Sequence, residues 1–292
     1  MSTDLSRRLF IAELAALGLS ATALSSCAQA ISRSGDRAGA NRIGLQLYTV
    51  RDLLEKDFEG TLAEVARIGY KEVEFAGYFG HTPQQVRAIL DRLHLTSPSA
   101  HVSVQLMRDD IANQVASAKA IGQEYITIPS YPLARDAGLD TFKQLAAELN
   151  QWGMMLRGVG LRIAYHNHSA EFVKVDGGPT GFDVLMRETD SGLVDFELDL
   201  YWATFADQDP IALMGKYPFR FPMWHVKDMQ LAAGKKEMAP VGRGSIDFKT
   251  IFEHAAQSGL KHFFVEHDNA ATTGGSIASI RASYASLRDM LS

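Results

Sequence analysis

The sequence predicts a single α/β domain folded as a closed barrel of eight parallel strands, each followed by a helix. From Arg42 onward, short apolar runs alternate with longer amphipathic segments, as expected for a parallel sheet covered by helices. Eight such units fit into about 250 residues, the usual size of a (β/α)8 TIM barrel. No glycine-rich phosphate loop follows the first run, so an open doubly wound sheet is the weaker alternative.

The predicted strands are short, and most of them are rich in β-branched or aromatic residues. They are Ile43–Tyr48, Glu72–Phe75, Ser97–His101, Tyr125–Ile128, a fifth that begins at Arg162, Val194–Asp199, Met223–Lys227 and His262–Glu266. Pro83 suits the first turn of a helix, and Gly160 suits the position just after one. The predicted helices are a segment ending near Ile68, Pro83–Leu93, Asp109–Ile121, Leu139–Val159, Phe182–Glu188, Pro210–Lys216, Phe248–Gln257 and Ser276–Leu291.

The composition excludes several classes of protein. The 292 residues are 46% hydrophobic and 22% charged, which is ordinary for a globular protein. A net charge of -5 gives no reason to expect a nucleic-acid surface. Cys27 is the only cysteine, so the chain has neither a disulfide framework nor a cysteine zinc cluster.

The N-terminus resembles an export signal. Arg7 and Arg8 precede a mildly apolar run, Leu9–Leu24, as in twin-arginine signals. The run is too short for a spanning helix and contains Glu13. The four residues Leu-Ser-Ser-Cys that end at Cys27 resemble a lipoprotein cleavage box, in which the cysteine is lipidated. The alternative is an amphipathic helix with a chance cysteine.

We therefore divide the chain into an export signal (1–27), a flexible tether (28–41) and a TIM-barrel domain (42–292). We expect a periplasmic protein that is exported already folded and held at the membrane by a lipid on Cys27. Simple cleavage without lipidation is the alternative. A periplasmic location argues against phosphorylated sugars as substrates.

Polar side chains gather where the predicted strands end, which is where the catalytic groups of such barrels lie. Five of the nine histidines lie at or just beyond a strand end. Histidines with carboxylates, and no thiolate, favour one divalent ion such as Mn, Zn, Co or Mg. The polar side chains at these ends are Glu74, His101, His166, His168, Asp199, His225, Lys227, Glu266 and Asp268.

The fifth strand is the most informative of these ends. Because side chains alternate along a strand, Ala164, His166 and His168 should share one face. Two imidazoles on one buried face need a partner, either a metal ion or hydrogen bonds to other polar groups. The stretch alone leaves both readings open.

Six segments, in this order and at these strand ends, are similar to one known family. They are Gly44–Arg51 (GLQLYTVR), Tyr165–His168 (YHNH), Leu198–Trp202 (LDLYW), His225–Asp228 (HVKD), Val241–Phe248 (VGRGSIDF) and Val265–Glu266. The chain thus resembles the sugar phosphate isomerase/epimerase family of xylose isomerase-like TIM barrels over residues 42–290, in a subgroup with the YHNH motif. The family hosts several reactions, so the resemblance leaves the reaction open.

The resemblance implies a single metal centre. Members commonly bind one divalent ion through Glu, Asp, His and Glu on strands five to eight. Asp199, His225 and Glu266 match the last three positions, whereas His166 replaces the first Glu. The ligand charge then falls from minus three to minus two, which leaves the metal a stronger Lewis acid.

The same replacement bears on the reaction. Ketose epimerases of the family use two metal-bound carboxylates as acid and base, and only Glu266 remains here. Two-base epimerisation would need a substitute such as His168, His101, Glu171 or Lys227. Proton abstraction next to a carbonyl, followed by loss of the β-substituent, needs one base. Keto-inositol dehydratases of the family, which also have a histidine-rich fifth strand, do this chemistry.

Five side chains are candidates for contact with the substrate. Trp202 stands where many epimerases have a histidine, and it could stack on a sugar ring or simply form the barrel wall. Glu74 and Glu171 could bind a sugar hydroxyl or support a ligand histidine. Lys227 could neutralise charge and donate to sugar oxygens, or pair with Glu197 or Asp228. His101 completes this set.

The sequence therefore predicts a metal-dependent sugar isomerase, epimerase, lyase or hydratase acting on a non-phosphorylated sugar or keto-sugar. One alternative is a non-catalytic sugar-binding lipoprotein, which would not need the ligand set. Another is a nuclease of the abasic-site endonuclease type, against which the net charge of -5 counts. The resemblance also implies a homo-oligomer, since dimers and tetramers are common in the family.

Overall fold

A computed structural model describes residues 42–132, 138–175 and 177–292. The predicted export signal and tether lie in residues 1–41, outside the described residues, so they stay predictions. Within the described ranges, no helix combines the length and the apolar character needed to cross a membrane.

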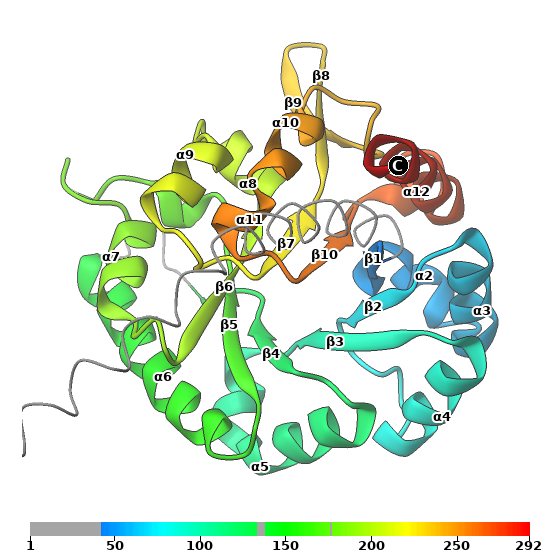
Figure 1. Cartoon of the computed structure of the whole chain (residues 1–292), viewed down its shortest axis with the longest axis horizontal. Helices are drawn as coiled ribbons and strands as arrows, with labels where there is room; N and C mark the ends of the chain where they lie inside the picture. The colour runs from blue at the N-terminus through cyan, green and yellow to red at the C-terminus, as the bar shows by residue number, and fades with distance from the viewer. Residues whose placement is uncertain (1–41, 133–137, 176) are drawn as a thin grey trace, which may run out of the picture.

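Eight parallel strands close into a barrel in the order β1-β10-β7-β6-β5-β4-β3-β2 (Figure 1), which confirms the predicted fold class. Nearly every strand residue is buried, because the outer faces lie under helices and the inner faces fill the barrel. The strands are β1 (Gly44–Gln46), β2 (Glu72–Phe75), β3 (Thr96–His101), β4 (Tyr125–Ile128), β5 (Arg162–His166), β6 (Val194–Asp199), β7 (Met223–Val226) and β10 (His262–Val265).

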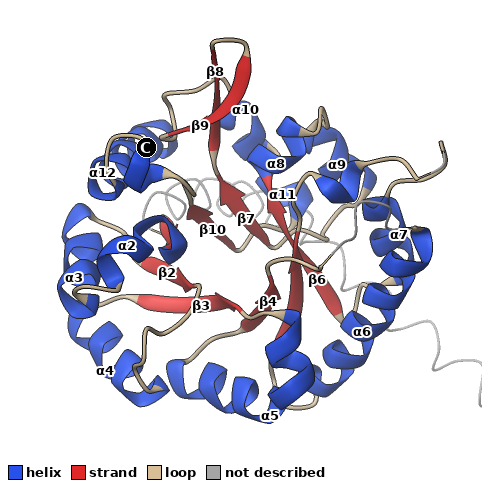
Figure 2. Cartoon of the chain, turned by 180° about the vertical axis from the view of Figure 1, so that it is seen from behind, coloured by secondary structure: helices blue, strands red, loops and turns tan. Residues whose placement is uncertain are grey.

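The helices form a ring outside the strands (Figure 2). Several begin at side-chain caps, such as Thr82, which forms a capping box before a first-turn proline. The helices are α2 (Arg51–Leu54), α3 (Phe58–Ile68), α4 (Pro83–Leu93), α5 (Val104–Ile121), α6 (Leu139–Arg157), α7 (Gly181–Glu188), α8 (Leu200–Phe205), α9 (Pro210–Lys216), α10 (Phe248–Glu253), α11 (Ala255–Ser258) and α12 (Ser276–Leu291), with short 3-10 turns η1 (Leu47–Val50), η2 (Ala170–Phe172) and η3 (Ala270–Thr272).

Most predicted elements are confirmed, and the differences have local causes. The first strand ends at Gln46, because its side chain caps η1 by accepting from the Tyr48 N–H. α5 starts five residues earlier than predicted, at a cap from Ser103, and its helical geometry breaks at Asp110. The helix predicted over Phe248–Gln257 divides at His254 into α10 and α11.

The sequence pattern did not predict a two-stranded hairpin after β7. Strands β8 (Asp228–Ala232) and β9 (Lys235–Ala239) pair antiparallel and project beyond the helix ring (Figure 1). Ala233 and Gly234 both have positive φ, as two-residue hairpin turns require. Lys236 holds the hairpin to the end of α8, donating to the Phe205 carbonyl at 2.8 Å.

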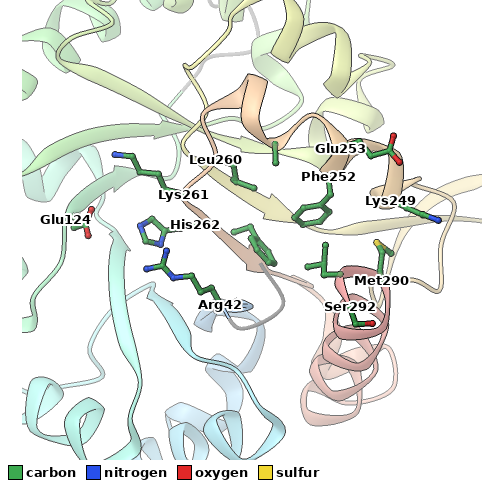
Figure 3. Close-up of a pocket in the computed structure, with 13 residues that line it drawn as sticks. Arg42, Glu124, Lys249, Phe252, Glu253, Leu260, Lys261, His262, Met290 and Ser292 are labelled. Atoms are coloured by element: carbon green, nitrogen blue, oxygen red, sulfur yellow. The ribbon is translucent and has the colours of Figure 1, made fainter. Parts of the chain in front are cut away.

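The amino ends of the strands form a polar base, shown in Figure 3, with a cavity of about 750 Å³. Arg42 and His262 line this cavity. His262 Nδ1 lies 2.7 Å from Glu72 Oε2, and Arg162 pairs with Asp195. None of the predicted site residues lines this cavity, since all of them come from the carboxyl ends of the strands.

Candidate metal centre and substrate cavity

The carboxyl ends of neighbouring strands bring the four predicted metal ligands together. Asp199 pairs with His225 in register, and Glu266 follows the end of β10 beside them. His225 Nδ1 lies 2.7 Å from Glu266 Oε2 and 3.9 Å from Asp199 Oδ2, and His166 Nε2 lies 3.7 Å from the same Oδ2. All four side chains are buried.

These residues fit a divalent ion. Asp199 Oδ1 accepts from the Trp202 N–H at 2.7 Å, which fixes the carboxylate as the cap of α8 and leaves Oδ2 without a hydrogen bond. Ligand atoms of Asp199, His225 and Glu266 all lie within 4.8 Å of one another. Two imidazole nitrogens with two carboxylates form a donor set that Mn, Zn and Co accept.

The charge balance of this end of the barrel also calls for a cation. Five carboxylates converge here, and the positive charges among them are the Lys227 ammonium and the imidazoles of His101 and His225, whose pKa values the carboxylates raise against burial. The carboxylates are Glu74, Glu197, Asp199, Glu266 and Asp268. Buried carboxylates are costly unless positive charge compensates them. Burial raises the pKa of Asp199 to about 6 although Lys227 and His225 oppose this shift. Burial therefore outweighs the neighbouring positive charges at this carboxylate, and a bound cation would offset that cost.

The two ligand histidines differ in their environments. Burial and the neighbouring His225 hold the pKa of His166 well below its usual range, so this imidazole is neutral and ready to bind a metal. Burial opposes protonation of His225, but Glu197 and Glu266 outweigh it and hold its pKa well above the usual range. A metal ion at its Nδ1 would replace that proton as the positive charge.

Lys227 contacts the predicted metal ligands Asp199 and Glu266, and not the partners suggested by the sequence. Its Nζ lies 2.7 Å from Glu266, 3.0 Å from Asp199 and 3.0 Å from Asp268, so the alternative pairing with Glu197 or Asp228 is wrong. Burial disfavours its charge, but these three carboxylates outweigh burial and hold its pKa well above the usual range. Its neighbours therefore hold Lys227 in the charged form.

Asp228 points away from Lys227 into a loop. Its carboxylate accepts from four backbone N–H groups at 2.8–3.2 Å, which belong to Met229, Gly242, Gly244 and Ile246. A carboxylate so fully used by a loop has no oxygen left for the lysine next to it.

A second layer of polar side chains lies deeper in the barrel. Glu74 Oε2 lies 2.7 Å from His225 Nε2 and accepts from the Gln46 amide at 2.7 Å. Glu74 is fully buried and does not line the substrate cavity, a position that favours support of a ligand histidine over contact with sugar. His101 Nε2 lies 2.8 Å from Glu197 and 3.3 Å from Glu74.

Glu197 is the principal site residue that reading the strand ends missed. It is fully buried, and its Oε2 lies within 3.0 Å of a nitrogen of each of three histidines, His101, His166 and His225. Glu197 precedes Asp199 by two residues, so strand alternation places both on the inner face. Extending that alternation one step inward from the strand end would have found it.

His168 lies just beyond β5, above the ligands, rather than within the strand as its alternation suggested. Its ring centroid is 4.9 Å from that of His166 and 5.4 Å from that of Trp202. Burial, with Lys227 adding to it, lowers the pKa of His168 to about 4. This imidazole is neutral at neutral pH and free to accept a proton.

Glu171 and Trp202 support His168 from the sides. Glu171 is buried and accepts from the Tyr165 hydroxyl at 2.6 Å and from the His168 backbone N–H at 3.0 Å. The buried Nε1 of Trp202 has no hydrogen-bond partner, and Lys227 Nζ lies 5.7 Å from the ring centroid. Neither residue lines the cavity.

A cavity of about 710 Å³ opens above the centre, large enough for a sugar. Six predicted or strand-end residues line it: His101, His166, His168, Lys227, Glu266 and Asp268. Sequence reasoning had not assigned Tyr48 and Arg51 to this cavity. Their side chains stack, with the guanidinium carbon 3.7 Å from the ring centroid, and they border the cavity beside η1.

Comparison with known proteins agrees with this architecture. The sequence matches the xylose isomerase-like TIM barrel family over residues 62–290. An inosose dehydratase from Lacticaseibacillus casei is 27% identical over 246 residues, which are 72% of this chain and 82% of that enzyme.

Two solved structures share the fold. A sugar phosphate isomerase/epimerase from Parabacteroides distasonis superimposes with a TM-score of 0.74 at 25% identity, covering 85% of this chain and 97% of that one. The IOLI protein, crystallised with a zinc atom, gives a TM-score of 0.64 over 86% of this chain and 98% of that one. At 12% identity, this second likeness shows the fold alone.

Proposed function

Because the chain belongs to the xylose isomerase-like TIM barrel family, we propose that it is a divalent-metal-dependent lyase that acts on a non-phosphorylated keto-sugar. The observation that carries this proposal is that His168 and Lys227 line one cavity beside the ligand set, with Lys227 Nζ 2.7 Å from Glu266. Burial lowers the pKa of His168 to about 4, and carboxylates outweigh burial to hold that of Lys227 well above its usual range, so the first is neutral and the second charged. The likeness to inosose dehydratases supports the choice of elimination.

His166, Asp199, His225 and Glu266 would hold the metal ion. When bound, the ion supplies positive charge next to the substrate carbonyl, which lowers the pKa of the neighbouring C–H. His168 takes that proton as the general base. Its backbone N–H donates to Glu171, which holds the residue in place. Lys227 lines the cavity and places a positive charge beside the substrate oxygens, while its N–H groups face Glu266, Asp199 and Asp268.

Elimination then needs no second base. The electrons of the broken C–H bond form a carbon–carbon double bond, and the bond from the β-carbon to its oxygen substituent breaks. The proton held by His168 passes to the departing oxygen, so the imidazole returns to its neutral form. The product is an unsaturated ketone, together with water or the released alcohol.

A decisive experiment incubates the purified, metal-loaded protein with keto-sugars and with 3-keto glycosides. We expect near-ultraviolet absorbance from a conjugated ketone and a loss of water or aglycone by mass spectrometry. His168→Ala should greatly reduce both, while His254→Ala, at a partly exposed position between α10 and α11, should not. A product of unchanged mass would contradict elimination.

The second candidate is an isomerase or epimerase, which the likeness to the Parabacteroides structure favours. Glu266 and His168 both line the cavity and could serve as the two bases. Incubation in heavy water separates the candidates, because epimerisation introduces deuterium next to the carbonyl without loss of mass. A non-catalytic sugar-binding lipoprotein would bind sugar and turn over neither class of substrate, and a nuclease would cleave abasic DNA.

We also propose that the protein is exported through its twin-arginine signal and lipidated at Cys27, on sequence grounds alone. Cells fed a fatty-acid analogue should label the wild type and not Cys27→Ala, which should appear in the soluble periplasmic fraction. Equal labelling of the two chains would contradict lipidation there.

A further inference from the structure

We infer that Glu197 is a positioning residue that fixes the tautomers of both histidine ligands from beneath the metal centre. This inference rests on the proposed function, since it assumes that the centre binds a divalent ion. Glu197 does not line the substrate cavity. Among the described residues, its hydrogen bonds go to histidines and not to Asp199 or Glu266.

The geometry places one carboxylate oxygen at a meeting point of three strands. Glu197 Oε2, from β6, lies 3.0 Å from His166 Nδ1 of β5 and 3.0 Å from His225 Nε2 of β7. His101 Nε2, from β3, lies 2.8 Å from the same oxygen. All three rings surround a side chain with no solvent exposure, so these contacts have no competition from water.

In each ligand histidine, one ring nitrogen faces the carboxylates of the metal centre and the other faces the carboxylates beneath it. His166 turns Nε2 toward Asp199 and Nδ1 toward Glu197. His225 turns Nδ1 toward Asp199 and Glu266, and Nε2 toward Glu197 and Glu74. A neutral imidazole that binds metal through one nitrogen has its proton on the other.

The tautomers follow from this arrangement. With metal at the upper nitrogens, His166 must be protonated at Nδ1 and His225 at Nε2. The His166 N–H donates to Glu197, and the His225 N–H donates to Glu74 at 2.7 Å with Glu197 Oε2 3.0 Å away. A carboxylate beneath each ring accepts the proton of the nitrogen that faces it, and so leaves the other nitrogen unprotonated for the metal. The two ligands use different ring nitrogens. Glu197, on the strand that also provides Asp199, lies 3.0 Å from the lower nitrogen of each, and it shares that of His225 with Glu74.

Neighbouring residues hold Glu197 in this role. His101 Nε2 contacts Glu197 as well, and its ring lies 5.1 Å from that of His166 and 5.2 Å from that of His225. Glu74 also contacts His225, and its Oε2 accepts from the Gln46 amide. Nitrogen and oxygen atoms of His101, His166, Glu197 and His225 lie within 4.8 Å of one another. In this inference His101 is a hydrogen-bond partner of Glu197 and not a metal ligand.

The test compares two isosteric substitutions. Glu197→Gln removes the charged acceptor beneath the ligands. Glu72→Gln is the matched control, because Glu72 is also a buried barrel carboxylate 2.7 Å from a histidine, His262, but at the base of the barrel. Affinity for Zn and Co is measured by competition with a chromophoric chelator, together with the visible spectrum of the Co form.

We expect Glu197→Gln to weaken metal binding about 10–100-fold and to alter the Co spectrum. Glu72→Gln should leave both unchanged, whatever its effect on stability. Equal affinity in wild type and Glu197→Gln, or an equal loss in both variants, would overturn the inference. A wild type that binds no ion would instead overturn the proposed function.

A second measurement does not depend on the folding of any variant. Histidine ¹⁵N NMR of the Zn-loaded wild type should show His166 protonated at Nδ1 and His225 protonated at Nε2. The opposite tautomer at either ring would contradict the inference directly.

Discussion

Single side chains divide into those that would hold the metal and those that would act on the substrate. Asp199 presents an oxygen without a hydrogen bond toward His166 and His225, whereas His168 contacts no member of the ligand set through a hydrogen bond among the described residues. Ligand and base are therefore separable by substitution.

Asp199→Ala and His225→Ala should each lose the metal, because each removes one of four donors and leaves the opposing charges buried. His168→Ala should retain the metal and lower turnover about 10²–10⁴-fold, the usual loss when a general base is removed. Metal analysis of gel-filtered protein and steady-state kinetics test both. Loss of metal from His168→Ala would show that the ligand on β5 is misassigned.

Asp228 allows a second test at the level of one residue. Its four backbone hydrogen bonds hold the loop after β9 against the hairpin. Asp228→Ala should lower the free energy of unfolding by about 2–4 kcal/mol, because buried N–H groups lose their acceptor. Denaturant titration measures the loss. Asp247→Ala, which removes an exposed cap of α10, should cost clearly less.

At the scale of elements, the start of α7 depends on one carboxylate. Asp183 accepts from the Thr180 hydroxyl at 2.8 Å, from Lys216 at 2.6 Å and from the Tyr217 hydroxyl at 2.8 Å. Burial would raise its pKa, but these hydrogen bonds outweigh burial and hold the pKa well below its usual range. The pair with Lys216 thereby joins α7 to α9.

The pH dependence follows from the sign of that shift. A depressed pKa stabilises the fold above the unfolded value, about 3.9, and the contribution is lost as the pH falls through the folded value. Asp183→Asn should therefore cost about 1 kcal/mol at pH 7, allowing for partial solvent screening. The difference from wild type should shrink steadily below pH 4, as measured by urea unfolding. The same substitution at exposed Asp289 should show no such trend. A difference as large at pH 2 as at pH 7 would contradict this account.

Most elements could be predicted because their patterns are local. Tyr125–Ile128 is a short apolar run between turns, and Pro83–Leu93 has its cap and proline, so both match the structure. The β8–β9 hairpin was missed because Lys235–Ala239 carries charged residues and no apolar alternation. That ribbon is stabilised by its turn and by Lys236, which are not visible as a hydrophobic pattern.

In the site too, local sequence patterns predicted some residues and missed others. Asp199, His225 and Glu266 end strands, so counting strand ends located them. The partners of Lys227 and the role of Glu197 depend on which strands are neighbours in the closed barrel, a relation that no local pattern contains.

At the scale of the molecule, the centre concentrates negative charge inside the barrel, and a bound cation should stabilise the whole fold. Chelation of the metal-loaded protein should lower the melting temperature, because a ligand at 100 times its Kd contributes about 2.7 kcal/mol. Differential scanning calorimetry with and without chelator tests this. Asp199→Asn serves as the control, since its melting temperature should not respond. An equal response in the two proteins would contradict a specific site.

The described chain begins at Arg42, which lines the basal cavity of Figure 3, at the end of the barrel remote from the substrate cavity. A lipid on Cys27 would therefore be joined to the base of the barrel. Fourteen residues, 28–41, separate the two points and reach at most about 50 Å when extended. Attachment at the base would leave the substrate cavity, at the other end of the barrel, accessible to sugars that diffuse in the aqueous compartment.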